Sequence, residues 1–181
     1  MAFGYQVLGF GSAAAAVAAA TYYGNRGVCV AGGGTSSGPI DYIAIDTPGN
    51  ASDFGDMADN DNLGGPGVSN GPRGVYAGGD GPRDVIEYIT FASTSNATDF
   101  GDLKTPRASG CPGVSNGTRG IFAGGQAGSG NVARTIEYIT IATTGNGTDF
   151  GELLYPSDYG VATHTSCNSA TRGFFMGGDT S

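Results

Sequence analysis

The stretch IEYITIATTGNGTDFGE, Ile136–Glu152, is the third copy of a motif that the chain also contains at Ile40–Asp56 and Ile86–Asp102. The copies begin 46 and 50 residues apart. A second motif, an Arg-Gly step followed by a short apolar run and a glycine pair, precedes each copy and occurs once more near the end of the chain. Its arginines are 47, 46 and 53 residues apart and comprise Arg26, Arg73, Arg119 and Arg172. Because the two motifs recur at nearly the same spacing, the chain contains an internal repeat.

The repeat divides the chain into units. We predict three complete units at about residues 24–70, 71–116 and 117–169, and a partial fourth unit at 170–181. Residues 1–23 are rich in Gly and Ala and do not follow the repeat. We therefore expect residues 1–23 to be an anchor segment that contacts another protein or a sister chain, and residues 24–181 to form the repeat domain.

Each unit has the residue types of β-strands. The apolar runs before the glycine pairs are rich in β-branched and aromatic residues. In the third unit Ile136 and Tyr138 alternate with Glu137 and Ile139, which is strand periodicity with apolar groups on both faces. A unit of 46 to 53 residues built from such short strands cannot bury its own faces and must stack on its neighbours. The sequence therefore predicts an all-β fold of β-propeller-type units.

A few residue types recur at fixed places, and we expect them to hold the repeat together. The arginine at each strand start is expected to span neighbouring units by bonding carbonyls or acidic groups. The glycine pairs are expected to let backbones approach closely where units converge. Besides the four arginines, the expected structural residues are Gly78, Gly79, Gly124, Gly125, Tyr42, Tyr88, Tyr138, Phe54, Phe100 and Phe150.

A glycine pair followed by a variable loop and a tyrosine-containing strand, as in Gly78–Gly79 with Tyr88, resembles a kelch repeat. Kelch units also carry a tryptophan, which this chain lacks, and the recurring phenylalanines stand at a comparable position. The whole phrase IEYITIATTGNGTDFGEL is more similar to the kelch-like repeats of virion proteins of tailed bacteriophages, those of cyanophages and marine phages in particular. This resemblance covers roughly residues 24–178 and implies a phage structural protein.

Three units and a partial fourth are few for a closed ring. A strand predicted at residues 5–12 can join the terminal strand at residues 173–178 and complete the fourth unit. The alternative is that chains associate and share a ring or a stack. Unpaired strand edges favour association, and we expect a homo-oligomer.

Composition and charge exclude several classes of function. The net charge is −8 and only eight residues are Lys or Arg, which disfavours binding to nucleic acid or to an anionic membrane surface. The three cysteines, Cys29, Cys111 and Cys167, are widely spaced and form no CxxC pair, so that a zinc site is not expected. One disulfide is possible, but three separate thiols are favoured. No cofactor is expected.

The acidic pairs of the Asp-Phe-Gly steps are the only candidate metal ligands. They could bind calcium, which prefers several oxygen ligands. The favoured alternative is that the first acid caps a tight turn and the second is solvated. The Asp-Phe-Gly triplet also occurs in protein kinases, where it binds a metal ion. That function is excluded here, because no phosphate-binding loop with a lysine accompanies the triplet. The candidate residues are Asp53, Asp56, Asp99, Asp102, Asp149 and Glu152.

The remaining polar motifs give little indication of a modification, catalytic or binding site. The acceptor triplets at Asn50, Asn96, Asn116 and Asn146 fit N-glycosylation, but turn formation explains them better. His164 is the only histidine, and no nucleophile motif accompanies it, so that we predict no enzyme activity. Four tyrosines outside the regular strands are freer to touch a ligand or partner, namely Tyr22, Tyr23, Tyr155 and Tyr159.

The sequence thus predicts a structural or accessory protein of a phage virion, located in the particle as a tail-fibre, tail-tip or capsid-decorating component. Its expected partners are other virion proteins and copies of itself. The alternative is an adhesin that binds host-surface glycans through the loops at residues 80–84 and 126–134.

Overall fold

The computed structural model describes residues 24–30, 38–59, 65–79, 81–108, 110–127, 133–154 and 165–176. All regular structure in these ranges is β-strand, which confirms the predicted all-β class. None of these ranges contains a helix that is long and apolar enough to cross a membrane. The expected anchor at residues 1–23, including the strand predicted at residues 5–12, lies outside the described ranges.

The strands form four antiparallel sheets in which the order of strands follows the chain. Sheet I contains β1 Arg26–Val30, β2 Pro39–Ala44 and β3 Ser52–Asp56. Sheet II contains β4 Gly67–Ser69, β5 Arg73–Ala77, β6 Arg83–Thr90 and β7 Thr98–Arg107. Sheet III contains β8 Gly113–Ser115, β9 Arg119–Ala123, β10 Thr135–Thr140 and β11 Thr148–Glu152. Sheet IV contains β12 Thr165–Asn168 and β13 Gly173–Met176.

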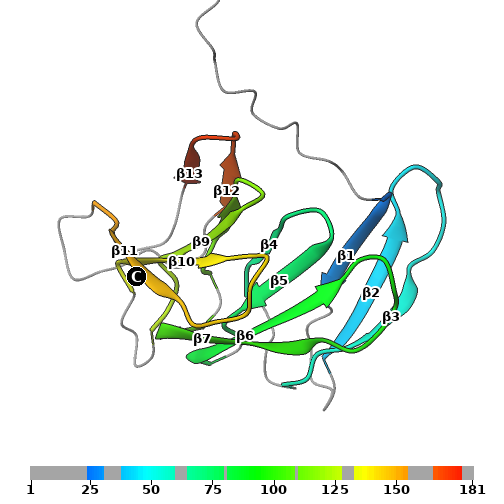
Figure 1. Ribbon diagram of the computed structural model, residues 1–181, viewed down its shortest axis with the longest axis horizontal. Coiled ribbons are helices and arrows are strands. Elements are labelled where there is room, and N and C mark those ends of the chain that lie inside the picture. Colours follow the sequence, from blue (N-terminus) through cyan, green and yellow to red (C-terminus); the bar gives the residue numbers. More distant parts are fainter. Residues whose placement is uncertain are drawn as a thin grey trace, which may run out of the picture.

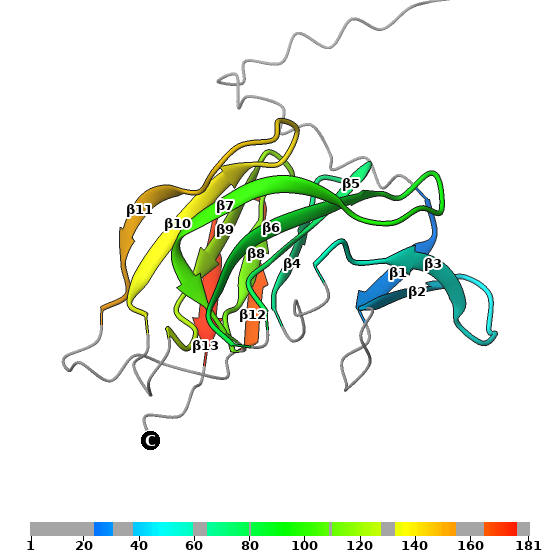
Figure 2. The same ribbon diagram turned by 90° about the horizontal axis from the view of Figure 1, so that it is seen from below.

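The sheets stand next to one another in chain order, with sheet II between sheets I and III and with sheet IV beside β8 (Figure 1, Figure 2). No described strand of one sheet pairs with a strand of another sheet. The short first strands β4, β8 and β12 are neighbours in space, because Ser115 Oγ donates to Ser69 O at 2.7 Å and Asn168 Nδ2 donates to Ser115 O at 2.5 Å. The described array is therefore open at both ends.

The sheet borders differ from the unit borders expected from the sequence. β4, β8 and β12 fall at the ends of the predicted units 24–70, 71–116 and 117–169, but each pairs with the strand that follows it. Sheets II, III and IV therefore begin one strand earlier than the repeat arithmetic placed them, whereas sheet I begins at β1. The reason is that a repeat defines a period, whereas hydrogen bonding decides at which strand a folded unit begins.

The Asp-Phe-Gly step is a β-bulge. Ile40 and Asp41 of β2 lie opposite Gly55 and Asp53 of β3, so that Phe54 is the extra residue. The same shift of register occurs between β6 and β7 and between β10 and β11. The sequence indicated a turn here, but the step lies inside the last strand of each sheet. The glycine of the bulge has a φ of +146°, +142° or +140° in Gly55, Gly101 and Gly151, a conformation that other residues rarely adopt.

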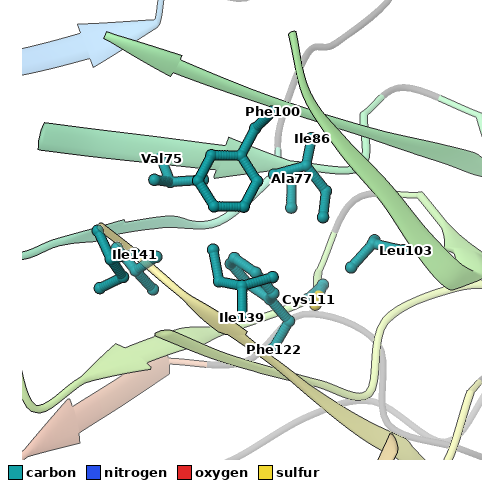
Figure 3. Packing of buried hydrophobic residues seen from close by; sticks show 10 residues of the cluster. Val75, Ala77, Ile86, Phe100, Leu103, Cys111, Phe122, Ile139 and Ile141 are labelled. Atoms are coloured by element: carbon teal, nitrogen blue, oxygen red, sulfur yellow. The ribbon is translucent and has the colours of Figure 1, made fainter. Parts of the chain in front are cut away.

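The apolar core lies between the sheets. Val75, Ile86 and Phe100 of sheet II face Phe122 and Ile139 of sheet III (Figure 3). A second cluster joins sheet I to sheet II through Ile40, Phe54, Met57, Ile89 and Ala97. Each sheet thus buries its apolar residues against its neighbour, as expected for a stacked repeat.

We expect Phe100→Ala and Phe150→Ala to differ sharply in stability, although the two residues occupy the same place in the repeat. Phe100 is 2% exposed, and its truncation leaves a cavity that costs about 3–5 kcal/mol of unfolding free energy. Phe150 is 52% exposed, and its truncation costs about 1 kcal/mol or less. Denaturant titration of both variants measures this difference. Equal losses would contradict the placement of the core.

Candidate assembly surface at the open ends of the array

An arginine, a tyrosine and a phenylalanine stack in each of the first three sheets. In sheet II the guanidinium of Arg73 lies 4.2 Å from the centre of the Tyr88 ring, and Tyr88 meets Phe100 edge to face with 6.1 Å between ring centres. The corresponding Arg–Tyr distances are 4.8 Å in sheet I and 4.1 Å in sheet III. Cation–π and aromatic contacts of this kind stabilise a fold by about 1 kcal/mol each. The stacks are Arg26–Tyr42–Phe54, Arg73–Tyr88–Phe100 and Arg119–Tyr138–Phe150.

Two of these arginines also reach the next sheet. Arg26 Nη1 of sheet I donates to Phe91 O of sheet II at 2.7 Å, and Arg73 Nη1 of sheet II donates to Ile141 O of sheet III at 3.1 Å. In each case the acceptor follows the third strand of the next sheet. The arginine therefore links its own aromatic stack to a neighbouring backbone, and it bonds a carbonyl rather than an acidic group.

A turn of each sheet docks on the bulged strand of the sheet before it. In the joint between sheets I and II, Asp56 N donates to Asn96 Oδ1 at 3.1 Å and Ala97 N donates to Asp56 O at 2.8 Å. A Cβ added to Gly55 would lie 2.5 Å from Ser95 O, so that only glycine allows this approach. The turn and the bulge therefore fit each other through backbone bonds and one asparagine side chain.

The joint between sheets II and III repeats these contacts. Asp102 N donates to Asn146 Oδ1 at 3.2 Å, and Gly147 N donates to Asp102 O at 2.7 Å. A Cβ added to Gly101 would lie 2.7 Å from the backbone of Gly145. The recurrence of the same bonds at both joints shows that they belong to the repeat and do not depend on one local sequence.

Each joint also has a buried acid on the third strand of the later sheet. Glu87 Oε1 accepts from Asp59 N at 2.9 Å. Glu137 accepts from Lys104 N at 2.7 Å and from Thr105 N at 3.0 Å. These carboxylates bind backbone N–H groups that lie in the last strand of the preceding sheet or just after it.

The second joint contains a buried ion pair. Arg107 Nη2 donates to Glu137 Oε1 at 2.9 Å, and both side chains are almost completely buried. Arg107 Nη1 also donates to Gly124 O at 2.5 Å and to Thr135 O at 3.0 Å. One side chain of sheet II thus binds three points of sheet III.

Gly78 and Gly125, one from each glycine pair, lie close to another part of the chain. A Cβ on Gly78 would lie 2.8 Å from Arg107 O at the end of β7, and Gly79 N donates to that carbonyl at 3.2 Å. A Cβ on Gly125 would lie 2.8 Å from Cys111 Cβ. Gly125 therefore approaches the predicted preceding unit, as expected, whereas Gly78 approaches a residue of its own unit. The partner of Gly78 is the last strand of the same sheet, because that strand is long enough to pass β6 and reach the glycine.

Sheet III has the features of a joint, but the two described strands of sheet IV, β12 and β13, do not bury them. Phe150 is 52% exposed, compared with 1% for Phe54 and 2% for Phe100. The difference cannot come from the strand itself, since all three lie at the same place in the same type of bulge. Among the described residues, no turn docks on β11 as turns dock on β3 and β7.

The glycine of this bulge shows the same difference. A Cβ on Gly151 would meet nothing within 4 Å, although the equivalent position at Gly101 is crowded by the next turn. Leu154 is fully exposed, and Arg119 is exposed where Arg73 is half-buried. We call this surface the open trailing face, comprising Arg119, Phe150, Gly151, Glu152 and Leu154.

Sheet I exposes the opposite half of a joint. Ile45 is 67% exposed, whereas the equivalent Ile141 of sheet III is completely buried. Ala51 in the turn of sheet I is exposed, whereas the equivalent Ala97 is buried against Asp56. We call this surface the open leading face, comprising Ile43, Ile45, Asn50 and Ala51. All large apolar side chains that are exposed in the described ranges lie on this face, on the open trailing face or on β13.

A cavity of about 390 Å³ lies between sheets I and II, lined in part by Val28, Ile40, Tyr76 and Glu87. In the next joint the equivalent space is filled by Val68 of β4, which packs on Gly120. Sheet I has no strand before β1 in the described residues. The polar groups of the cavity are engaged, because Glu87 accepts from Asp59 N and the Tyr76 hydroxyl accepts from Gly65 N. Burial raises the pKa of Tyr76 to about 12, so that the hydroxyl stays protonated near neutral pH.

The other residues singled out in the sequence have local roles or lie outside the described ranges. Asp53 and Asp149 each accept from the backbone N–H of their bulge glycine at 3.1 Å, and the described residues contain no cluster of three or more metal-binding side chains. Asn116 forms a turn by accepting from Thr118 N and Arg119 N. The four tyrosines proposed for ligand contact, the single histidine and most of the loop at residues 126–134 lie outside these ranges. They are Tyr22, Tyr23, Tyr155, Tyr159, His164 and residues 128–132.

Sequence reasoning missed the side chains that join the sheets. Asn96 and Asn146 were interpreted as turn formers, but they bind the preceding sheet. Glu137 and Arg107 were not singled out. A signal for Glu137 was present, since it lies on the same face of its strand as the apolar residues Ile139 and Ile141. Arg107 has no counterpart in the other units and left no such signal.

No protein-family model and no curated protein sequence matches this chain. Among solved structures, that of YjhT is similar with a TM-score of 0.69 and 10% identity, over 87% of this chain and 55% of that one. A Bacteroides fragilis NCTC 9343 protein described as a "putative 6-phosphogluconolactonase" is similar with a TM-score of 0.51 and 15% identity, over 82% of this chain and 43% of that one. This chain spans about half the length of these two proteins.

Identities this low show a shared β-rich fold and nothing of function. One of the two similar structures is described as an enzyme, so that the fold itself does not exclude catalysis. The absence of enzyme activity therefore stays a prediction of the sequence.

We expect Arg107→Met to cost about 3–5 kcal/mol of unfolding free energy, because it leaves the Glu137 carboxylate buried without its charged partner. The double variant Arg107→Met/Glu137→Gln should recover part of this loss, since the uncompensated charge is gone. The control is Arg134→Met, which breaks the exposed Arg134–Glu152 pair and should cost about 1 kcal/mol or less. Denaturant unfolding measures all three. A loss as small as that of the control would show that Arg107 does not hold the joint.

We expect the cysteines to differ in reactivity. All three are free, and Cys111 is buried whereas Cys29 and Cys167 are exposed. Burial raises the pKa of the Cys111 thiol to about 11, which keeps the reactive thiolate scarce at pH 8. Iodoacetamide should therefore alkylate Cys29 and Cys167 in the native protein and Cys111 only after unfolding, as read by mass spectrometry of tryptic peptides. Rapid alkylation of Cys111 in the native protein would be inconsistent with this core.

Proposed function

We propose that this chain is a structural or accessory component of a bacteriophage particle, which acts by assembling with other particle proteins and with copies of itself. The observation that carries the proposal is the distribution of exposed apolar side chains. In the described ranges these side chains lie only on the open leading face, the open trailing face and β13. The equivalent surfaces inside the chain form contacts between neighbouring sheets, and exposed apolar patches of this kind mark sites of interaction with other proteins. The resemblance of the repeated phrase to kelch-like repeats of phage virion proteins supports the type of particle.

We further propose that the four sheets are units of an incomplete β-propeller. Strand order that follows the chain within each sheet, short first strands gathered side by side and a similar structure of nearly twice the length all support this arrangement. In such an architecture the open ends are where further units complete the ring. The same surfaces therefore serve for assembly. In this proposal the repeat serves to bind additional sheets, and it does not form a catalytic centre.

The test is incorporation into particles. An epitope-tagged chain and a variant lacking residues 1–23 are expressed during infection, and gradient-purified particles are analysed by immunoblotting. We expect the full chain in infectious particles, and we expect the variant to be absent because the anchor segment is missing. A full chain that never copurifies with particles would refute the proposal. Binding to host glycans that is lost on replacing the loops at residues 80–84 and 126–134 would favour the adhesin instead.

A further inference from the structure

Sheet I has three described strands whereas sheets II and III have four, and the difference lies at the first strand. β5 pairs with β4 and β9 pairs with β8, but β1 pairs only with β2 among the described strands. The cavity of about 390 Å³ between sheets I and II borders on β1, since Val28, Cys29 and Val30 belong to its wall. The cavity therefore lies where sheet I is one strand shorter than its neighbours.

In the later joints a side chain of the first strand packs on glycines of the next sheet. Val68 of β4 lies against Gly113 and Gly120, where an added Cβ would be 3.0 and 2.7 Å from the Val68 side chain. The same contact recurs between sheets III and IV, where a Cβ on Gly173 would lie 2.7 Å from Val114 of β8. The contact is therefore a regular part of the repeat.

The glycines one sheet earlier lack this neighbour. Gly67 and Gly74 of sheet II are the equivalents of Gly113 and Gly120, and both line the cavity. A Cβ on Gly67 would meet nothing within 4 Å, and the atoms nearest to a Cβ on Gly74 belong to Ile89 and Phe91, on and just after β6. The cavity thus occupies the place that Val68 fills in the next joint.

The spacing of the repeat identifies the residue that belongs at this place. Val68, Val114 and Cys167 hold equivalent positions on the first strands of sheets II to IV, each five residues before the repeat arginine of its own sheet. The same count from Arg26 of sheet I leads to Thr21. Thr21 lies outside the described ranges.

The chain enters β1 in the way in which it enters β5 and β9. Gly24, Gly71 and Gly117 stand two residues before the repeat arginine and have φ values of +99°, +97° and +83°. The carbonyl of the next residue accepts an N–H bond from the residue that follows the adjacent strand, at 2.6, 2.9 and 3.0 Å respectively. At Gly71 and Gly117 the chain arrives from β4 and β8. Gly24 therefore has the backbone geometry of a turn that follows a first strand.

We propose that residues 20–22 of this chain are the first strand of sheet I and fill the cavity between sheets I and II. They pair antiparallel with β1 in the register of β4 with β5, so that Thr21 lies opposite Val28 as Val68 lies opposite Val75. A β-branched residue suits such a place on a strand. The repeat domain then begins at residue 20 instead of residue 24, and the cavity holds a segment of the protein itself instead of a small ligand.

The occupant is this segment and not a second copy, because the segment is already tethered to the cavity wall. The predicted strand is joined to β1 by residues 23–25, a connection as short as residues 70–72 between β4 and β5. A tether of this length gives the segment a high effective concentration at the edge of β1. A strand from another chain has no such advantage.

The test is a disulfide between Thr21→Cys and Gly67→Cys in the full chain. Gly67 has room for a side chain, and the equivalent pair has Val68 Cγ1 at 3.0 Å from a Cβ on Gly113. The two Cβ atoms are thus within about 4.5 Å, the range of disulfides. Both exposed cysteines, Cys29 and Cys167, are replaced by Ser. Oxidised glutathione is the oxidant: the two protein thiols lose their hydrogens to form the bond, and one glutathione disulfide is reduced to two glutathione molecules.

The bond is read by mass spectrometry after tryptic digestion without reduction. We expect the peptides 1–26 and 27–73 to be joined within monomeric protein. The matched control is Ala16→Cys with Gly67→Cys, which places the first thiol outside the proposed strand and should give a yield about tenfold lower. Equal yields in the two variants, or a bond found only between chains, would overturn the proposal.

Two deletions test the same strand without new cysteines. Removing residues 1–19 keeps the strand, so we expect the melting temperature and the hydrogen exchange of residues 26–30 to stay as in the full chain. Removing residues 1–22 deletes the strand and should lower the melting temperature by about 4 °C or more and speed exchange in residues 26–30. Identical behaviour of the two deletions would refute the strand.

The deletions also separate this proposal from the proposed function. The chain that lacks residues 1–19 retains the first strand, so that its absence from particles would concern the anchor alone. If it enters particles while the deletion of residues 1–22 unfolds sheet I, the strand is supported and the anchor is refuted.

Discussion

The docking of a polar turn on the bulged last strand of the sheet before it is the contact on which the whole array depends. A sheet of three or four short strands has apolar groups on both faces and cannot bury them alone. The bulge glycine removes the side chain that would block the turn, and the asparagine replaces the hydrogen bond that a regular strand would have made. Since the contact is local and repeated, the stability of each sheet comes from its immediate neighbours.

The two internal joints add different side chains to this contact. Between sheets II and III the buried Arg107 pairs with Glu137 and also donates to two carbonyls. In the joint between sheets I and II, Glu87 accepts from Asp59 N, and a cavity lies beside it. A buried pair gains little over apolar packing in net energy, but breaking half of it is costly. Arg107 therefore makes the joint between sheets II and III specific for its register, because a shifted register would leave a buried charge without its partner.

The sequence was sufficient for the all-β class and for the places of the repeated strands, because periodicity and glycine placement are local properties. It was insufficient for the borders of the sheets, since β4 differs from a loop only through its pairing with β5. The Asp-Phe-Gly step was misjudged as a turn, because a bulge uses the same residue types as a turn. The sequence could not predict the residues of the joints, namely Asn96, Asn146 and Arg107. Their partners lie in the preceding or the following repeat, and no spacing within one unit reveals such a contact.

Exposed edges and apolar patches usually lead a protein to aggregate, and the form of these ends limits that outcome. The trailing face is not flat: the bulge at Phe150 and Gly151 twists the strand and admits only a chain that brings a close-approaching turn. A surface of this shape disfavours a flat strand, because a contact that does not fit the bulge gains less free energy than one that does.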